Sequence, residues 1–325
     1  MRGVTHDERR ARLGVGVGLA LVSAASFGLS GTVARGLLEA GWSPGAAVTA
    51  RIWLGALVLL VPGLLALRGR FGLLRRRLPL VATYGVLAVA GCQLCYFFAI
   101  EYLQVGVALL IEYAAPAAVV LWMWLRHGQA PSRLTLAGAA VALAGLVLVL
   151  DLVSGGDLDV VGVLWALGAM VGVSAYFVIS ADEGNGLPPL SLAAAGLVVG
   201  GTVLTVAGVV GLLPMDATTA RVSYVGLDVD WWVPVLALGV VTAALSYSTG
   251  IAAGRRLGPR VASFVGLFEV VFALVFAWLL LAELPRAVQL LGGALILAGV
   301  VLVRRGEARG PAAESVAVHH EPLPG

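Results

Sequence analysis

The chain has 325 residues, of which 60% are hydrophobic and 12% charged, and its formal net charge is +3. A soluble globular domain carries roughly 25% charged residues, so this composition excludes an ordinary water-soluble protein. It also excludes a disordered chain, which needs low hydrophobicity, and a nucleic-acid-binding protein, which needs a strongly basic face. The lipid bilayer is therefore the expected surrounding medium.

Long apolar runs recur along the whole chain. A spanning helix needs roughly 20 apolar residues, and we take runs of about that length as spans where charge, proline or glycine clusters interrupt them. The first run follows arginines as in a signal peptide, but it is long enough to span, so we expect it to remain as the first helix. We predict ten spanning helices, over residues 13–35, 43–67, 79–100, 104–126, 134–151, 159–181, 189–212, 232–254, 259–282 and 286–303.

The arginines predict the orientation of these helices, because basic loops stay in the cytoplasm. With an even number of spans both chain ends lie on one side, and placing them inside puts most arginines in the cytoplasm. Residues 1–12 are then a cytoplasmic N-terminal segment, and the polar, proline-bearing residues 305–325 are a disordered cytoplasmic tail. The predicted location is a multi-pass position in the cell membrane, with both termini cytoplasmic.

The chain contains an internal repeat. Sliding it by about 154 residues places Gly85 on Gly239, Gly138 on Gly292 and the Leu-Ala-Gly ending at residue 145 on the one at residue 299. A shift of about 144 aligns the first two spans with the sixth and seventh. Since each copy has an odd number of spans, the second copy enters the membrane from the opposite side. We therefore predict an all-α membrane protein of two inverted five-helix repeats, over residues 13–155 and 156–304.

These features carry a resemblance to a known family. The five-plus-five layout, the mid-helix Pro116, the short turn to Pro131 and the paired Leu-Ala-Gly endings resemble the two EamA domains of the drug/metabolite transporter superfamily. The resemblance covers about residues 13–304. It implies a ten-helix carrier, commonly an exporter of amino acids or other small metabolites and sometimes of cationic drugs. The second copy departs from the first by Val270 in place of Pro116, and the first has Gln129 where the second has the usual acidic Glu283.

Three ionisable residues lie within predicted spans, where a charge costs about 2.5–3.5 kcal/mol on insertion scales. They are Arg51, Glu112 and Glu269. For each acid, one reading is substrate or proton binding in a central cavity, and the other is a structural hydrogen bond by a protonated carboxyl group. Arg51 lies at a depth that allows pairing with Glu112. It is read either as a packing or snorkelling residue or as a residue that binds the substrate directly. Arg35 and Glu101, at predicted outer helix ends, are expected to be solvated.

Pro116 predicts a helix kink, because proline leaves the carbonyl of Glu112 without its helical partner. Four aromatic residues with a polar group are candidates for lining the cavity: Tyr113, Trp165, Tyr176 and Tyr247. Hydroxyl groups in these spans are expected to bond mostly to their own helix.

The sequence offers no set of residues typical of a metal or redox centre. The four histidines, His6, His127, His319 and His320, lie at chain ends or loop edges. Cys92 and Cys95 fall within an apolar run, and we interpret them as small packing residues rather than a redox pair. We expect neither a metal nor another cofactor.

The sequence thus predicts a secondary transporter, not an enzyme. We expect it to export a small organic metabolite such as an amino acid by alternating access, with proton coupling as an option. The partners expected are the small-molecule substrate and the bilayer, with no nucleic acid. The alternatives are a multidrug or lipophilic-cation carrier, a channel, a non-transporting scaffold and a lipid-active membrane enzyme. The enzyme would need a cluster of catalytic groups at one depth, and a channel would need a continuous polar stripe.

Overall fold

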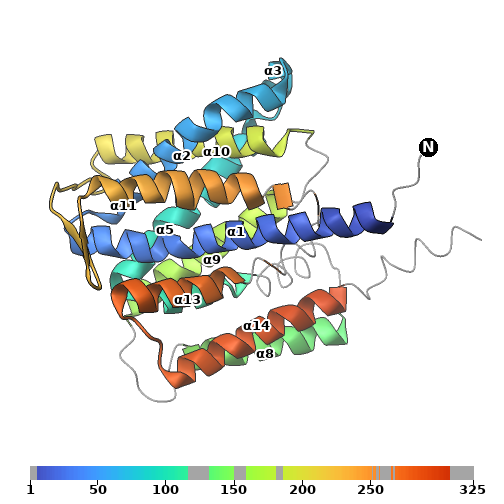
Figure 1. The fold of residues 1–325 in the computed structure, drawn as a ribbon, viewed down its shortest axis with the longest axis vertical. Helices are drawn as coiled ribbons and strands as arrows, with labels where there is room; N and C mark the ends of the chain where they lie inside the picture. Colours follow the sequence, from blue (N-terminus) through green and yellow to red (C-terminus); the bar gives the residue numbers. More distant parts are fainter. Residues whose placement is uncertain are drawn as a thin grey trace, which may run out of the picture. The chain divides into compact units, whose positions relative to one another are not determined.

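The computed structural model describes residues 6–115, 132–149, 159–180, 186–250, 252–253, 256, 265 and 268–307. Helices make up most of this described part (Figure 1). The helices of the first half are α1 (His6–Glu39), α2 (Pro44–Leu67), α3 (Phe71–Arg76), α4 (Leu78–Thr83), η1 (Tyr84–Gly91), α5 (Cys92–Tyr102), α6 (Val105–Glu112) and α8 (Arg133–Val149). Those of the second half are α9 (Val160–Ser180), α10 (Pro189–Val209), α11 (Trp232–Leu236), η3 (Ala237–Leu245), α13 (Phe268–Leu281) and α14 (Ala287–Glu307).

Among the described residues, five helical stretches are long and apolar enough to cross a membrane. They are Gly14–Glu39, Pro44–Leu67, Leu78–Tyr102, Pro189–Val209 and Trp232–Gly250. Shorter apolar helices cover Arg133–Gly145, Val160–Tyr176, Phe268–Leu281 and Leu290–Gly299. The chain is an all-helical membrane protein in its spanning part. Of the predicted run 104–126 only the beginning is described, so Pro116 and its predicted kink lie outside the described residues.

The chain divides into two compact units. One comprises Met1–Glu112 and Leu158–Pro285, and the other Tyr113–Asp157 and Arg286–Gly325. In the described part, the first unit contains most helices, and the second consists of α8 and α14, which lie side by side (Figure 1).

In the first unit, α2 and α10 pack in antiparallel directions. Gly45 at the start of α2 lies against Leu213, just beyond the end of α10. Farther along α2, the indole Nε1 of Trp53 donates to Thr205 Oγ1 at 2.9 Å, and the carbonyl of Gly63 accepts from Ser191 Oγ at 2.8 Å. The partner's number falls as the α2 number rises, so the two helices run in opposite directions. They are the second and seventh predicted spans, which the repeat makes equivalent.

In the second unit, α8 and α14 also pack antiparallel and touch through glycine. A Cβ added at Gly145 would lie 2.5 Å from the carbonyl oxygen of Gly292, and one added at Gly299 would lie 2.5 Å from that of Gly138. The 154-residue offset equates Gly138 with Gly292 and Gly145 with Gly299. The two contacts are therefore the same contact seen from each helix, as expected for equivalent helices related by a two-fold axis.

Two π-helical segments occur at equivalent places in the two copies, where the sequence predicted ordinary α-helix. They are η1 and η3, and the 154-residue offset places Tyr84–Gly91 on residues 238–245. Each packs on the second helix of the other copy, η1 on α10 and η3 on α2. The approach is close, because a Cβ added at Gly85 would meet Val199 and one added at Gly239 would meet Leu54. Wide helical turns of this kind are often found at functional sites.

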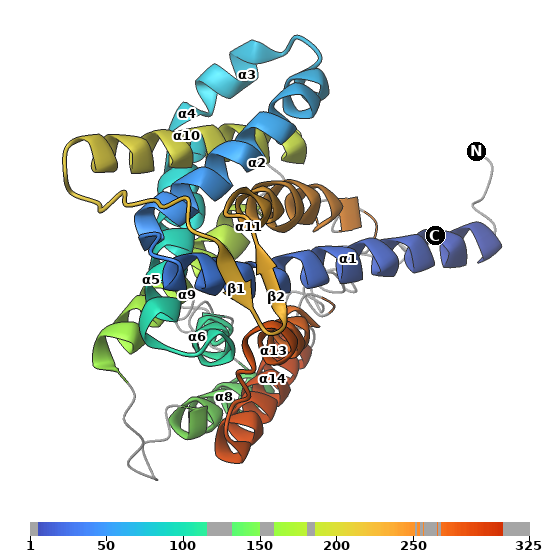
Figure 2. The same cartoon turned by 60° about the vertical axis from the view of Figure 1, so that its left-hand side comes forward.

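A short antiparallel hairpin, β1 (Val222–Tyr224) with β2 (Leu227–Val229), interrupts the all-helical pattern between α10 and α11. Its turn contains Gly226 with a φ of 71°, a left-handed conformation that glycine adopts readily. The hydroxyl of Tyr224 donates to the carbonyl of Val33 in α1 at 3.0 Å, and the amide of Val225 donates to Leu280 O in α13 at 2.8 Å. The hairpin thus lies across the end of α1 and reaches α13 (Figure 2).

The segment before the hairpin is bound to the turn between α1 and α2. Ser43 caps α2, ahead of a proline at its first position, and its hydroxyl also donates to Pro214 O at 2.7 Å. Trp42 donates to Thr218 O at 2.9 Å, and Thr218 donates back to Ala40 O at the same distance. These bonds fix the loop over the α1–α2 turn.

Candidate substrate-binding site

Arg51 is buried in the first unit, with a relative exposure of 2%. It extends from α2 toward two other helices. Its Nη1 donates to Gln93 Oε1 of α5, and its Nη2 donates to the carbonyl of Thr242 in η3 at 2.9 Å. The guanidinium carbon lies 5.7 Å from the centre of the Phe97 ring, within range of a cation–π contact. The snorkelling position considered from the sequence is therefore wrong, because this side chain does not reach solvent.

Glu112 is buried at the end of α6, with 6% exposure. Its Oε1 lies 3.6 Å from the thiol of Cys92, and that thiol is also 3.6 Å from Ala169 O in α9. The pairing of Glu112 with Arg51 that the sequence allowed is not a direct contact, since Arg51 bonds to Gln93 and Thr242. The two charges do interact electrostatically across the interior.

Glu269 lies in the first turn of α13 and is half-buried. α13 packs closely on α1, where a Cβ added at Gly28 would lie 2.8 Å from the carbonyl oxygen of Glu269. Glu269 interacts electrostatically with both Glu112 and Arg51. The structure thus brings together the three ionisable residues that the sequence placed within spans.

Two of the predicted aromatic residues lie near this charged group. Tyr247 is 5% exposed, packs edge-to-face on Phe27 at 5.1 Å, and interacts electrostatically with Arg51 and Tyr176. The ring of Tyr176 lies 6.1 Å from that of Tyr84.

The other two predicted aromatic residues are placed less directly. Trp165 stacks on Phe98 at 4.6 Å, which gives it a packing role between α9 and α5. Tyr113 follows Glu112 and is half-buried.

Sequence reasoning missed Gln93, Thr242 and Tyr96. The first two supply the acceptors of Arg51, and Tyr96 is 5% exposed with its hydroxyl against Gly31 of α1. The signal for Gln93 was present, because an uncharged polar residue within a span also needs a partner. The carbonyl of Thr242 has no signal in the sequence.

The hydroxyl groups of the spans behave in two ways. Ser174, Ser246, Ser248 and Thr249 donate to carbonyls three or four residues earlier in their own helices, which confirms the expectation. Ser30 in α1 and Thr49 in α2 are buried without a hydrogen-bond partner in the described part of the chain. A polar solute could use such hydroxyls, because a buried group without a partner costs roughly 1–3 kcal/mol.

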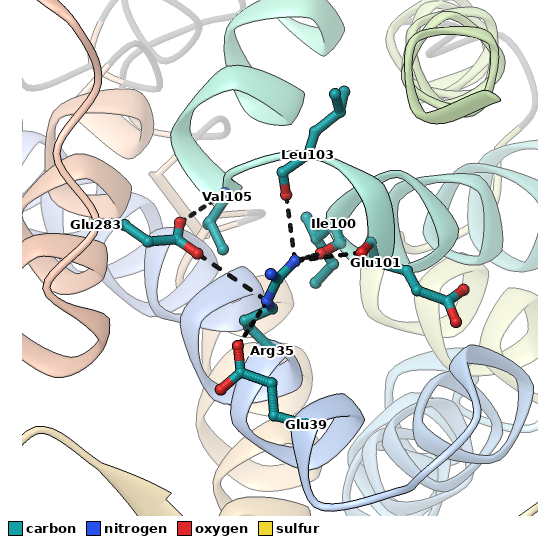
Figure 3. A network of polar contacts seen from close by, with 7 residues as sticks. All are labelled: Arg35, Glu39, Ile100, Glu101, Leu103, Val105 and Glu283. Carbon is teal, nitrogen blue, oxygen red and sulfur yellow. Dashed lines mark hydrogen bonds and ion pairs between the residues drawn. The ribbon is translucent and has the colours of Figure 1, made fainter. Parts of the chain in front are cut away.

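A second polar cluster, which we name the α1-end cluster, comprises Arg35, Glu39, Glu283 and the backbone of residues 100–105 (Figure 3). The Nε of Arg35 lies 2.9 Å from Glu39 and 4.0 Å from Glu283. Its Nη1 donates to the carbonyl of Ile100, with Leu103 O at 3.4 Å. The expectation that Arg35 is solvated is wrong, since its side chain is 24% exposed and held on several sides. Glu101, which was also expected to be solvated, is exposed.

Within the described residues, no group of three or more histidine, cysteine, aspartate or glutamate side chains is arranged to hold a metal ion. Cys92 and Cys95 are free thiols.

Comparisons with known proteins agree with this architecture. The sequence profile of the EamA-like transporter family matches twice, over residues 14–151 and 160–305. A threonine/homoserine exporter, RhtA, of Escherichia coli K12 is 28% identical over 315 residues, covering 89% of this chain and 92% of that protein. A probable terminal-alkyne amino-acid exporter of Streptantibioticus cattleyicolor is 28% identical over 232 residues, covering 71% of this chain and 74% of that protein. One crystal structure, 22% identical, aligns with a TM-score of 0.59 over 94% of this chain and 99% of its own length.

Proposed function

The chain belongs to the EamA-like transporter family, and from that premise we propose that it exports a small amino acid across the membrane by alternating access. Membership places it among multi-pass membrane transporters and not among enzymes, as the sequence predicted. The resemblance to amino-acid exporters supports the substrate class. The observation that carries the proposal is a buried arginine close to two acids within the spanning region.

This arrangement suits an amino-acid zwitterion. A guanidinium binds a carboxylate through charge-assisted hydrogen bonds, and Arg51 would exchange one of its present acceptors for the substrate carboxylate. Glu112 or Glu269 would receive the ammonium group or, in the empty carrier, a proton. Since like charges in a shared site resist ionisation together, one acid holding a proton while the other binds the substrate gives a basis for proton exchange.

The proposed movement exchanges two mirror-related packings of the copies, which we place at residues 13–155 and 156–304 in ten spanning helices. The antiparallel contacts of α2 with α10 and of α8 with α14 support this inverted relation. We also propose that both termini are cytoplasmic, which the distribution of arginine supports. The end of α1 then lies at the external face.

The test is flux in proteoliposomes. The purified protein is reconstituted into proteoliposomes, and these vesicles are loaded with labelled threonine or homoserine. Exchange is then measured against unlabelled amino acids and against a lipophilic cation. We expect saturable amino-acid counterflow, with net flux responding to an imposed pH gradient. Glu112→Gln together with Glu269→Gln should abolish uphill transport driven by the gradient. Glu101→Gln, at an exposed acid of the same chain, is the matched control.

Four outcomes would contradict the proposal. Counterflow of the cation without the amino acid would favour the multidrug alternative. Flux that does not saturate would favour a channel, and binding without flux would favour a scaffold. Gradient-driven flux unchanged in the double variant would remove the two acids from the coupling.

A further inference from the structure

The α1-end cluster combines charges from both copies at one end of the helices. Arg35 and Glu39 are on α1, whereas Glu283 follows α13. Ala282, directly after α13, has a left-handed conformation with a φ of 55°, and Glu283 N then donates to Ala277 O at 3.2 Å. This turn directs the carboxylate back toward α1 and α6.

The carboxylate of Glu283 closes this end by joining three helices. Its Oε2 accepts from the backbone amide of Val105 at 3.0 Å, the first residue of α6, whose amide has no partner within its own helix. Its Oε1 faces Arg35. Figure 3 shows Glu283 and the carbonyl of Ile100 on opposite sides of the Arg35 guanidinium. Separation of α13 from α1 and α6 at this end would break these contacts together.

The cluster is one positive charge short. Among the described residues of the first unit, Arg35 is the one guanidinium that pairs with the two carboxylates, and it lies nearer to Glu39, at 2.9 Å, than to Glu283, at 4.0 Å. The side chain of Glu39 is 56% exposed and can be hydrated, whereas that of Glu283 is 15% exposed. An ionised Glu283 is therefore only partly compensated where it lies.

In the part of the first unit that the structure describes, the neighbouring groups supply no further cation. The carboxylate of Glu101 points away from Arg35 in Figure 3. Tyr96 of α5 interacts electrostatically with Glu283, and Tyr224 of the hairpin with Glu39. In the chain Arg286 follows three residues after Glu283.

We propose that Glu283 is a proton-binding site at the α1 end of the protein, and that uptake of a proton there favours the closed arrangement of this end. The inference rests on the proposed function for its place in the cycle. After release of the substrate outside, Glu283 is hydrated in the open state. It takes a proton from the external solution and closes against Val105 and Arg35. The closed external end then favours the return of the carrier to its inward-facing state.

The direction of this linkage follows from burial. Burial raises the pKa of Glu283 above its ordinary value, although the Val105 amide and Arg35 lower it in part and Glu39 raises it further. A group with a higher pKa in the closed state than in the hydrated open state binds its proton more tightly when closed. A lower external pH therefore closes this end, and a higher pH opens it.

The experiment measures access to a reporter cysteine one turn inside the cluster. Ala108→Cys places it on α6, at a position with no exposure. A membrane-impermeant maleimide is added outside right-side-out vesicles, and labelling is read by mass spectrometry of this peptide, separately from Cys92 and Cys95. Because thiol reactivity itself varies with pH, each rate is divided by that of Gln104→Cys, an exposed position at the same end.

In the otherwise unchanged chain we expect the normalised rate to fall as the external pH is lowered through the raised pKa of Glu283, by at most about tenfold per pH unit for one proton. Glu283→Gln keeps an acceptor for the Val105 amide and mimics the protonated acid. It should give a low rate that does not depend on pH. Glu39→Gln, which removes the other carboxylate at Arg35, should keep the dependence.

Two results would overturn the proposal. One is a normalised rate that does not change with pH in the reporter chain that keeps Glu283. This result can be observed even if the Glu283 variants do not fold. The other is the original pH dependence persisting in Glu283→Gln. The labelling uses no substrate, so a failure here is distinct from a failure to transport amino acids.

Discussion

Replacing Gln93 by leucine tests whether Arg51 depends on a neutral partner for its buried position. Leucine fills a similar volume, so the main loss is the hydrogen bond from the guanidinium. A hydrogen bond to a charged group contributes about 1.5–3 kcal/mol. Thr242 O and the Phe97 ring remain, so the cost should stay below the roughly 3–5 kcal/mol of a buried charge that loses its partner altogether.

The free energy of unfolding is measured in mixed micelles by denaturant titration, with tryptophan fluorescence as the signal. We expect Gln93→Leu to lose about 1.5–3 kcal/mol. Gln104→Leu, at an exposed position, should stay within about 0.5 kcal/mol of the unchanged chain. In a double-mutant cycle with Arg51→Met, the Gln93 substitution should then cost little.

Two results would refute this reasoning. A Gln93→Leu protein as stable as the Gln104→Leu control would show that Arg51 does not need this acceptor. Strict additivity in the cycle would show that the two side chains are not coupled.

Three further predictions concern the helix contacts and the α1 end. Gly299→Ala should destabilise the α8–α14 pair by about 1–3 kcal/mol through overpacking, whereas Gly14→Ala, which has open space around it, should not; equal melting temperatures would contradict this. Tyr224→Phe should lower the free energy of unfolding by about 1 kcal/mol near neutral pH, because the hydrogen bond to Val33 O is lost. Burial raises the pKa of Tyr224, so the unchanged chain should lose stability above about pH 10, and the variant should not show this loss. An unchanged alkaline stability profile in the variant would contradict this prediction. Since the pKa of Glu283 is raised in the folded protein, its protonated form favours folding. The contribution of this group to stability should be greatest near or below about pH 4 and fall as the pH rises through the raised pKa. Glu283→Gln should flatten that part of the pH profile of the melting temperature, and an unaltered slope would exclude Glu283 as its source.

Hydrophobic length predicted the five helical stretches of the described residues that are long and apolar enough to span, because a helix in lipid must satisfy its backbone internally and this requires a long apolar run in the sequence. The repeat offset also predicted which glycines are equivalent, and the contact of Gly145 with Gly292 has its counterpart at Gly299 and Gly138. The small hairpin was missed, although a glycine follows Tyr224 and Val225 at a natural turn position.

The partners of charged residues were harder to predict. Arg51 lay at a depth that suggested pairing with Glu112, but helix rotation decides which side chain it meets, and rotation directs it to Gln93 and a backbone carbonyl. Arg35 was expected in solvent because it lies at a helix end. A tertiary contact with a loop far away in the chain, at Glu283, encloses it instead.

The two wide helical segments bear directly on the acceptors of Arg51. Thr242 lies within η3, and Gln93 lies two residues after the end of η1. A π-helical turn holds one residue more than an α-helical turn needs, so rewinding either segment by a single residue would rotate the helix beyond it by about 100°. Such a step would carry one acceptor off the guanidinium without breaking the helix. The two copies thus place a wide helical segment at or beside each of the two acceptors of one buried cation.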